Sequence, residues 1–318
     1  MKLTRSIKTL SLIMLLALTL LMVTNTVSFA EEIKAATETK AAPAETKVAP
    51  PEAEKPTGEA AVAVMSQYFW RGYELSRNSI VVQPAMTVAY KGFSTNIWGN
   101  LDTRAYYAGT QEGKTYGGTW NETDFTLSYT KTLGLFNLGA GYIYYALGAL
   151  NPDGFKRADA QEIFASVGLN TLLSPTLTVY KEIDHYRNMY YLLGVSHVFE
   201  LNKAVSLKLS ATGSYLQSGY ADAALFNAGA GYGGYPKFDG MSAATNEKFS
   251  NFHDGNVTVS LPIKATKYIT ITPTISYIFP LSDDAKYEMK GQGIKGTASP
   301  GDRDSSFIYG GLAASFSF

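Results

Sequence analysis

From residue 60 to the C-terminus the chain repeats one pattern, about ten residues of alternating apolar and polar side chains followed by a break. The segment Thr123–Thr130 is a clear example, because Phe, Leu and Tyr occupy every second position with Asp, Thr and Ser between them. The last segment keeps the alternation up to the terminal Phe318. A period of two with one apolar face predicts β-strands. We find no sustained period of 3.6 residues in this region.

Twelve segments have this pattern, and the sequence therefore predicts twelve strands. They are residues 61–71, 80–90, 93–103, 122–131, 135–147, 159–170, 175–186, 188–199, 204–217, 254–264, 268–279 and 305–318. With an even number of strands in a meander, the first strand starts and the last strand finishes at the same end of the sheet.

The connections between these segments alternate in length. Those after every second strand are short, as at Lys91–Gly92, whereas most of the others are long, with extremes at Ser218–Gly255 and Pro280–Asp304. Only the connection after the seventh strand is short out of turn. Short periplasmic turns alternating with longer outside loops are typical of outer-membrane barrels. We therefore predict an all-β fold, a transmembrane antiparallel up-and-down β-barrel of about twelve strands.

A soluble β-sandwich is the main alternative, and it fits the composition less well. The polar face of the strands carries many Thr, Ser and Asn side chains, and burying their groups unpaired in a dry core would cost roughly 1–3 kcal/mol each. In a membrane barrel the apolar face meets lipid and the polar face meets the lumen. The chain also has 22 Tyr, 16 Phe and 3 Trp, many of them at predicted strand ends, where aromatic girdles lie.

The N-terminus predicts export. Residues 1–30 combine basic residues, an apolar run from Leu10 to Val23 and a small-x-small cleavage site at Ser28–Ala30, which together indicate a signal peptide. Residues 31–59 are rich in Ala, Pro, Glu and Lys and contain no aromatic residue, so we predict a disordered periplasmic linker. The barrel domain is then 60–318. We expect a location in the outer membrane of a Gram-negative cell.

Composition narrows the range of partners. The chain has no Cys, and its 27 Lys and Arg residues balance its 27 Asp and Glu residues. Nothing in this balance suggests a nucleic-acid partner, and none is expected. The expected partners are outer-membrane lipid, the barrel-assembly machinery and small polar solutes or ions. The terminal Phe318 would lie on the lipid face of the closing strand and is the candidate assembly signal.

The strand phases give candidates for the lumen wall. The residues expected to point inward are Arg71, Gln83, Asn96, Asp124, Glu162, Lys208 and Asp254. Arg71 would either line a constriction or pair with a wall carboxylate, Asp124 or Glu162. The predicted strand 175–186 does not fit this assignment of inward and outward faces, because Lys181 and Glu182 are adjacent and one of them must point toward lipid.

We find no sequence pattern that indicates catalysis. Outer-membrane lipid hydrolases use a Ser–His pair, but His185, His197 and His253 lie in no such motif and have no metal-ligand spacing. The segment Gly229–Gly234 satisfies G-x-G-x-x-G, yet it lies in the longest loop with no helical pattern after it, so a dinucleotide site is not expected. No catalytic, cofactor or metal site is therefore predicted, and the protein is not expected to be an enzyme.

One stretch carries a family resemblance. Ser66, Tyr68, Trp70, Arg71 and Gly72 form an S-x-Y-x-W-R-G motif, followed by a Gln-Pro strand at 83–84 and a G-F-x-x-x-I-W-G-N strand at 92–100. This stretch resembles the start of the TorF-like family of porin-type outer-membrane proteins, whose functions are largely unassigned. The resemblance implies a barrel in the outer membrane and implies no substrate.

The function expected from these features is passive passage of small polar solutes or ions. Eight-stranded barrels are filled by their own side chains, while barrels of sixteen to eighteen strands leave an aqueous channel. Twelve strands lie between, so a structural or surface-binding barrel with a blocked lumen is an alternative, and an outer-membrane lipid hydrolase is a less favoured one. The inward carboxylates outnumber the inward basic residues, which predicts a weak preference for cations.

Overall fold

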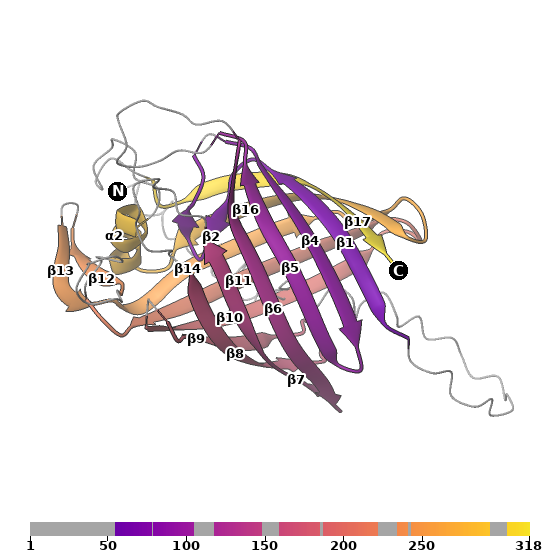
Figure 1. Cartoon of the computed structure of the whole chain (residues 1–318), viewed down its shortest axis with the longest axis horizontal. Coiled ribbons are helices and arrows are strands. Elements are labelled where there is room, and N and C mark those ends of the chain that lie inside the picture. Colours follow the sequence, from indigo (N-terminus) through magenta and orange to yellow (C-terminus); the bar gives the residue numbers. More distant parts are fainter. Residues whose placement is uncertain are drawn as a thin grey trace, which may run out of the picture.

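Twelve long antiparallel strands form a sheet that closes on itself (Figure 1). The computed structural model describes residues 55–77, 79–104, 118–147, 159–184, 187–221, 234–240, 243–292 and 304–318. The barrel strands are β1 (Thr57–Met65), β4 (Val81–Tyr90), β5 (Phe93–Asp102), β6 (Thr119–Leu133), β7 (Phe136–Leu147), β8 (Ala160–Leu169), β9 (Thr176–Glu182), β10 (Asn188–Glu200), β11 (Ser206–Ser218), β14 (Ser250–Ser260), β16 (Ile269–Pro280) and β17 (Phe307–Ser317). Each strand pairs with its neighbours in this order, and β1 pairs with β17 to close the ring. The predicted fold class is confirmed.

The two ends of the barrel differ, as the connection lengths predicted. We call the end with the short connections the turn end and the opposite end the loop end. Both the start of β1 and the end of β17 lie at the turn end. At Lys91–Gly92 both residues have positive φ, 50° and 84°, which is the type I′ geometry that suits a two-residue hairpin. The loop end carries a small hairpin of β12 (Pro236–Asp239) and β13 (Ala243–Lys248), and a helix, α2 (Asp283–Gln292). A two-residue strand, β15 (Ile263–Lys264), adds to β16 at the turn end.

The first strand differs from its prediction at both ends. It begins at Thr57, within the stretch predicted as linker, and it ends at Met65 rather than at residue 71. The chain then leaves the wall and forms a separate hairpin of β2 (Phe69–Trp70) and β3 (Tyr73–Glu74). The turn of this hairpin, Arg71–Gly72, again has positive φ at both residues, 48° and 83°, so it forces a tight reversal that a continuing strand could not make.

The helix α2 was not predicted. Its N-terminus is capped by Ser282, whose side-chain oxygen accepts a hydrogen bond from the Ala285 amide at 3.1 Å. Acidic residues occupy the first turn and Lys290 the last, in keeping with the helix dipole. Ala285, Glu288 and Met289 are buried, so one face of the helix packs into the mouth of the barrel. Within the described ranges, no helix is long and apolar enough to cross a membrane.

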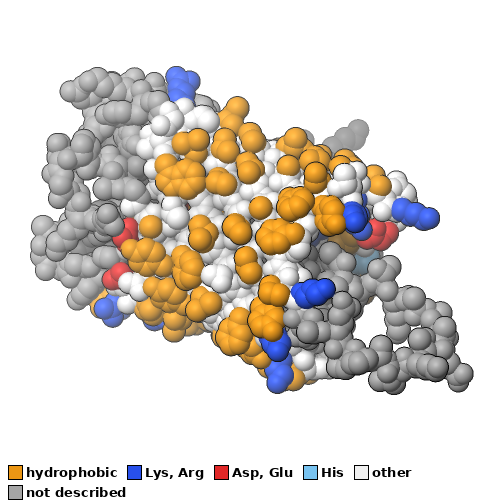
Figure 2. Space-filling view, turned by 45° about the vertical axis from the view of Figure 1, so that its right-hand side comes forward, with side chains coloured by type: hydrophobic (Ala, Val, Ile, Leu, Met, Phe, Trp, Pro, Cys, Tyr) orange, Lys and Arg blue, Asp and Glu red, His pale blue; other side chains and the backbone are white. Residues whose placement is uncertain are grey.

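The outer surface of the sheet is apolar. Figure 2 shows hydrophobic side chains spread over the strands and charged ones toward the two ends. Exposed apolar side chains of the strands include Met86, Val88, Phe93, Ile97, Phe125, Leu127, Tyr129, Ile163, Val167, Leu177, Leu193, Val259, Ile275, Tyr277, Ile308, Leu312 and Phe316. A closed sheet with a lipid-facing apolar belt satisfies all its ladder groups internally, as a membrane-spanning sheet must. The protein is an outer-membrane β-barrel.

The adjacent residues Lys181 and Glu182 of strand β9 (Thr176–Glu182) face opposite sides of the barrel wall. β9 is short and ends at Glu182, so Lys181 is its second-last residue, and the pairings on both sides of β9 run without a register shift. Glu182 is buried on the inner face, and its carboxylate accepts a hydrogen bond from the Asp184 amide at 2.8 Å. Lys181 therefore lies on the outer face near the loop end, where a lysine can extend its ammonium to the headgroup level.

The barrel closes tightly at its terminal residue. Phe318 and Gly58 exchange two backbone hydrogen bonds of 2.9 and 2.8 Å beyond the end of β17. The ring of Phe318 covers Gly58 so closely that a Cβ there would clash with the ring. The side chain is 56% exposed on the outer face, as the alternation predicted.

Candidate functional site

The β2–β3 hairpin, Phe69–Glu74, lies inside the barrel at the loop end, and we call it the plug. Its tip is the Arg71–Gly72 turn. A glycine is required at position 72 for two reasons. Its φ is positive, and a Cβ would lie only 2.8 Å from Met289 and 3.0 Å from Asp254. Figure 1 shows β2 at the same end of the barrel as α2. The W-R-G part of the sequence motif thus builds the tip of the plug.

Arg71 joins the plug to the barrel wall. Its two terminal nitrogens donate hydrogen bonds of 2.8 and 2.6 Å to the two carboxylate oxygens of Glu162 on β8. The side chains are 10% and 2% exposed, so this bidentate pair is shielded from water. The sequence placed Arg71 at the end of the first strand, which is wrong, but Glu162 is one of the two partners that it named.

Aromatic rings surround the same guanidinium. Its carbon lies 4.2 Å from the ring centre of Tyr190, 4.8 Å from that of Tyr180 and 4.5 Å from that of Trp70. The Tyr145 hydroxyl completes the site by donating a hydrogen bond of 2.9 Å to Glu162. Tyr145, Glu162, Tyr180 and Tyr190 come from four adjacent wall strands, β7 to β10, and we call them the lumen cage. Cation–π contacts gain strength in such desolvated surroundings.

A second buried network holds Tyr73 of the plug. Its hydroxyl donates to Glu288 of α2 at 3.0 Å and lies 3.2 Å from Nε2 of His253. Burial, and next the charge of Glu288, raise the pKa of Tyr73 well above its ordinary value, so the phenol stays a donor. The hydroxyl thereby connects the plug to α2 and to β14.

His253 lies between two carboxylates. Its Nδ1 is 3.0 Å from Asp254 and its Nε2 is 2.8 Å from Glu288, and the side chain is fully buried. Two adjacent residues of one strand face inward here because the β11–β14 register shifts between Gly213 and Tyr215. With both ring nitrogens facing carboxylates, the ring can donate to both only as an imidazolium.

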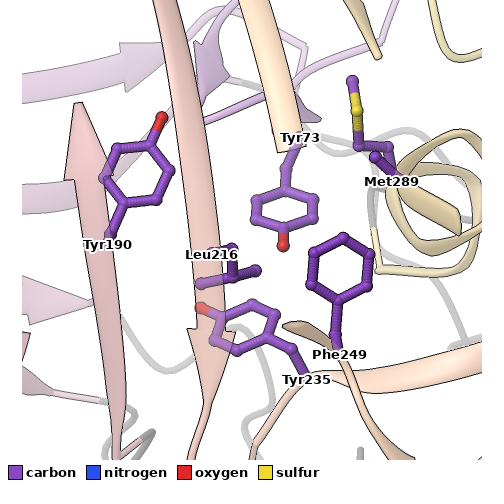
Figure 3. Packing of buried hydrophobic residues seen from close by; sticks show 7 residues of the cluster. Tyr73, Tyr190, Leu216, Tyr235, Phe249 and Met289 are labelled. Atoms are coloured by element: carbon purple, nitrogen blue, oxygen red, sulfur yellow. The ribbon is translucent and has the colours of Figure 1, made fainter. Parts of the chain in front are cut away.

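Apolar side chains close the space between these networks. Tyr73 stacks on Tyr235 with ring centres 5.8 Å apart, and Phe249 meets His253 edge-on at 5.3 Å. Figure 3 shows Tyr73, Tyr235 and Phe249 turned toward one another, with Met289 of α2 beside them. The loop-end cluster consists of Tyr73, Tyr190, Leu216, Tyr235, Phe249, Ala285 and Met289. The gaps between Arg71, this cluster and His253 are too small to hold a water molecule.

The turn-end half of the lumen is different. Many of its inward side chains are small and polar. Some are partly exposed, namely Thr126, Thr130, Ser166, Ser210, Thr212, Thr258, Ser260, Thr270, Thr272 and Thr274, whereas Thr87, Ser128, Thr176, Thr178, Ser196 and Ser206 are buried. The lumen is therefore narrow and filled at the loop end and lined by hydroxyl groups toward the turn end.

The predicted lumen residues all lie on the inner side, with Arg71 reaching there from the plug. The amide of Gln83 donates to Asn100 at 3.0 Å and that of Asn96 to Thr87 at 2.8 Å. Asp124 has one carboxylate oxygen that is buried without a hydrogen-bond partner among the described residues. Asp254 accepts hydrogen bonds from Tyr190 at 2.8 Å and Ser214 at 2.7 Å. Lys208 lies on the inner face of β11, opposite Ser260 in the ladder.

Several site residues were not found from sequence. Tyr145, Tyr180, Tyr190 and Glu288 each lie far in sequence from Arg71 and Tyr73, and only their inward strand phase or helix face could have pointed to them. His253 was placed correctly near the outer end of its strand, but its inward orientation depends on the register shift. His185 and the GAGYGG motif, except Gly234, lie outside the described residues. Among the described residues no group of three or more His, Asp or Glu could hold a metal ion.

One family model matches part of the chain. Residues 52–174 match the model of a family described as "Bacterial protein of unknown function (Gcw_chp)". The resemblance to the TorF-like family stays a prediction. Among proteins with curated descriptions, none matches the chain.

Solved structures similar to this chain are outer-membrane proteins. The NanC porin is 12% identical, with a TM-score of 0.43, covering 81% of this chain and 98% of its own. LpxR from Salmonella typhimurium is 7% identical, with a TM-score of 0.44 and coverage of 82% and 99%. An outer-membrane channel from Pseudomonas putida F1 is 11% identical, with a TM-score of 0.42 and coverage of 86% and 100%. At these values the likeness does not bear on what the chain does.

Proposed function

We propose that this outer-membrane barrel passes small polar solutes or ions and that its own plug closes the path at the loop end. The observation that carries the proposal is the Arg71–Glu162 pair, which fixes the plug across the lumen with bonds of 2.8 and 2.6 Å. The partly exposed hydroxyl-lined half supports a path for solutes, because a purely structural barrel of this width could be packed with large side chains. Passage then requires the plug to leave the wall.

The hairpin offers a clean deletion that tests this function. The amide of Leu75 donates to the Tyr68 carbonyl at 2.9 Å, so the two ends of the plug already lie together, and Phe69–Glu74 can be replaced by two glycines. In planar bilayers we expect the wild-type protein to give little or no steady current and the plug-deleted barrel to conduct steadily. Heat modifiability on gels shows that each variant is folded.

A matched control disturbs the same segment without releasing it. Arg77 pairs with Glu74 at 3.1 Å within the segment and does not reach the cage, so Arg77→Ala should behave as the wild type. Steady current through the wild-type protein would contradict closure by the plug. A folded but silent plug-deleted barrel would contradict transport.

A barrel that is permanently closed and works through its outer surface is the second candidate. It is favoured by the loop-end cluster, in which wall residues such as Leu216 pack continuously against Tyr235, Phe249 and α2. The silent outcome of the deletion experiment would support this candidate.

We further propose that neither of the described histidines, His197 and His253, activates a serine for hydrolysis. A nucleophilic serine needs a base within hydrogen-bond reach. Ser214 donates to Asp254 at 2.7 Å instead of to His253, and both His253 nitrogens face carboxylates. His197 lies near the turn end, with Nδ1 2.8 Å from the Leu172 carbonyl and its ring against Phe199.

A further inference from the structure

The lumen cage belongs to the wall, whereas its occupant belongs to the plug. Tyr180 and Tyr190 are directly opposite each other in the β9–β10 ladder, with ring centres 6.2 Å apart. Glu162 and Tyr145 lie on the two preceding strands and are joined by their own hydrogen bond of 2.9 Å. Strand pairing and these contacts hold the cage residues in place. The cage therefore has a defined shape apart from the side chain that now fills it.

The chemistry of the cage selects one kind of cation. A carboxylate that accepts two parallel hydrogen bonds matches a planar guanidinium, and the faces of Tyr180 and Tyr190 match its delocalised charge. A simple ammonium could make the charge contact but could not pair with both oxygens in the same plane. The cage is thus a receptor for a guanidinium group, and Arg71 is a guanidinium tethered beside it.

We propose that the lumen cage is a binding site for solutes that carry a guanidinium group, and that Arg71 is its built-in competitor. The proposal rests on the proposed function, because the solute would take the place of the plug. The gaps beside Arg71 and Tyr190 are too small for a water molecule. A solute can therefore occupy the cage only when Arg71 leaves it.

Competition with a tethered group sets the scale of the effect. A group on a short tether acts at an effective concentration in the millimolar range. A free solute with the same intrinsic affinity for the cage must therefore reach roughly millimolar concentration to displace Arg71. Removing Arg71 removes this competition. Binding to the emptied cage should therefore be saturable and much tighter than apparent binding to the wild type.

The experiment supplies a guanidinium to a cage without its occupant. Methylguanidinium is added at constant ionic strength to the folded Arg71→Ala protein and to the plug-deleted barrel, and the melting temperature is followed by heat modifiability. We expect a saturable rise in both, because a ligand that binds only the folded state stabilises it. Methylammonium should bind at least about tenfold more weakly, because it loses one hydrogen bond worth about 1.4 kcal/mol. The added change Glu162→Gln should abolish the difference between the two cations.

The opposite results are equally specific. Equal effects of the two cations, or no saturable effect in either folded variant, would show that the cage only latches the plug. If neither variant folds, the wild-type protein decides: methylguanidinium should release the plug and expose the Arg71–Gly72 bond to trypsin, and continued resistance would overturn the proposal. Conductance of the plug-deleted barrel is a separate measurement, so failure of this site and failure of the channel function can be told apart.

Discussion

At the scale of single residues, Arg71 combines two unfavourable features. It adopts a left-handed backbone conformation with φ of 48°, which costs a non-glycine residue some energy, and it buries a charge. A buried ion pair is weak evidence for stability, since desolvation offsets most of the attraction. The pair with Glu162 is therefore better explained by position than by stability. It sets where the plug sits across the lumen.

Removing one member of this pair should release the plug. Glu162→Gln leaves the Arg71 charge buried without a counter-charge, and breaking such a pair costs about 3–5 kcal/mol. We expect trypsin to cut the folded variant after Arg71, where the wild-type protein resists. The control is Glu74→Gln, since Glu74 pairs locally with Arg77. Equal resistance of Glu162→Gln and wild type would show that the pair does not hold the plug.

At the scale of elements, the long strands were predictable and the inserted elements were not. The twelve wall strands follow from one physical constraint, because each faces lipid on one side and the lumen on the other and must alternate. The plug and α2 obey no such constraint. Their local signals are short, an Arg-Gly turn at residues 71–72 and a Ser282 cap before two acidic residues, and packing inside the barrel decides their conformation.

The closing strand gives a test at this scale. Phe318 extends the β17–β1 ladder by two backbone hydrogen bonds and covers Gly58 with its ring. Deletion of Phe318, or Phe318→Asp, should lower the amount of heat-modifiable protein in the outer membrane and increase periplasmic degradation. Phe318→Tyr keeps the ring and the hydrogen bonds and is the control. Equal folded amounts for all variants would contradict a role of this residue in assembly.

At the scale of the whole molecule, the inner wall was predictable but its closure was not. Strand phase alone placed Gln83, Asn96, Asp124, Glu162, Lys208 and Asp254 on the inner side. It could not bring Arg71 to Glu162, because that contact joins residues 91 positions apart through a segment that leaves the wall. Whether a twelve-stranded lumen is open depends on such insertions. The sequence therefore left the open and the blocked barrel undecided.

The charge of the wall predicts the selectivity of the opened barrel. The plug-deleted protein lacks Arg71. Its inward carboxylates on the described strands include Glu122, Asp124, Glu162, Glu182 and Asp254, and its inward basic residues there include Lys208, His253 and Lys264, which is opposite Thr270 at the turn end. Carboxylates along a low-dielectric passage concentrate cations, so we expect cation preference in reversal potentials across a KCl gradient.

Salt and substitution sharpen this prediction. The preference should largely disappear at 1 M salt, where the Debye length falls to about 3 Å. Glu162→Gln in the plug-deleted barrel should weaken the preference, because it removes one carboxylate from the narrow half, and Lys208→Gln should strengthen it. Anion preference at low salt would show that loop residues at the mouth, rather than the carboxylates of the wall, set the charge that a permeating ion meets.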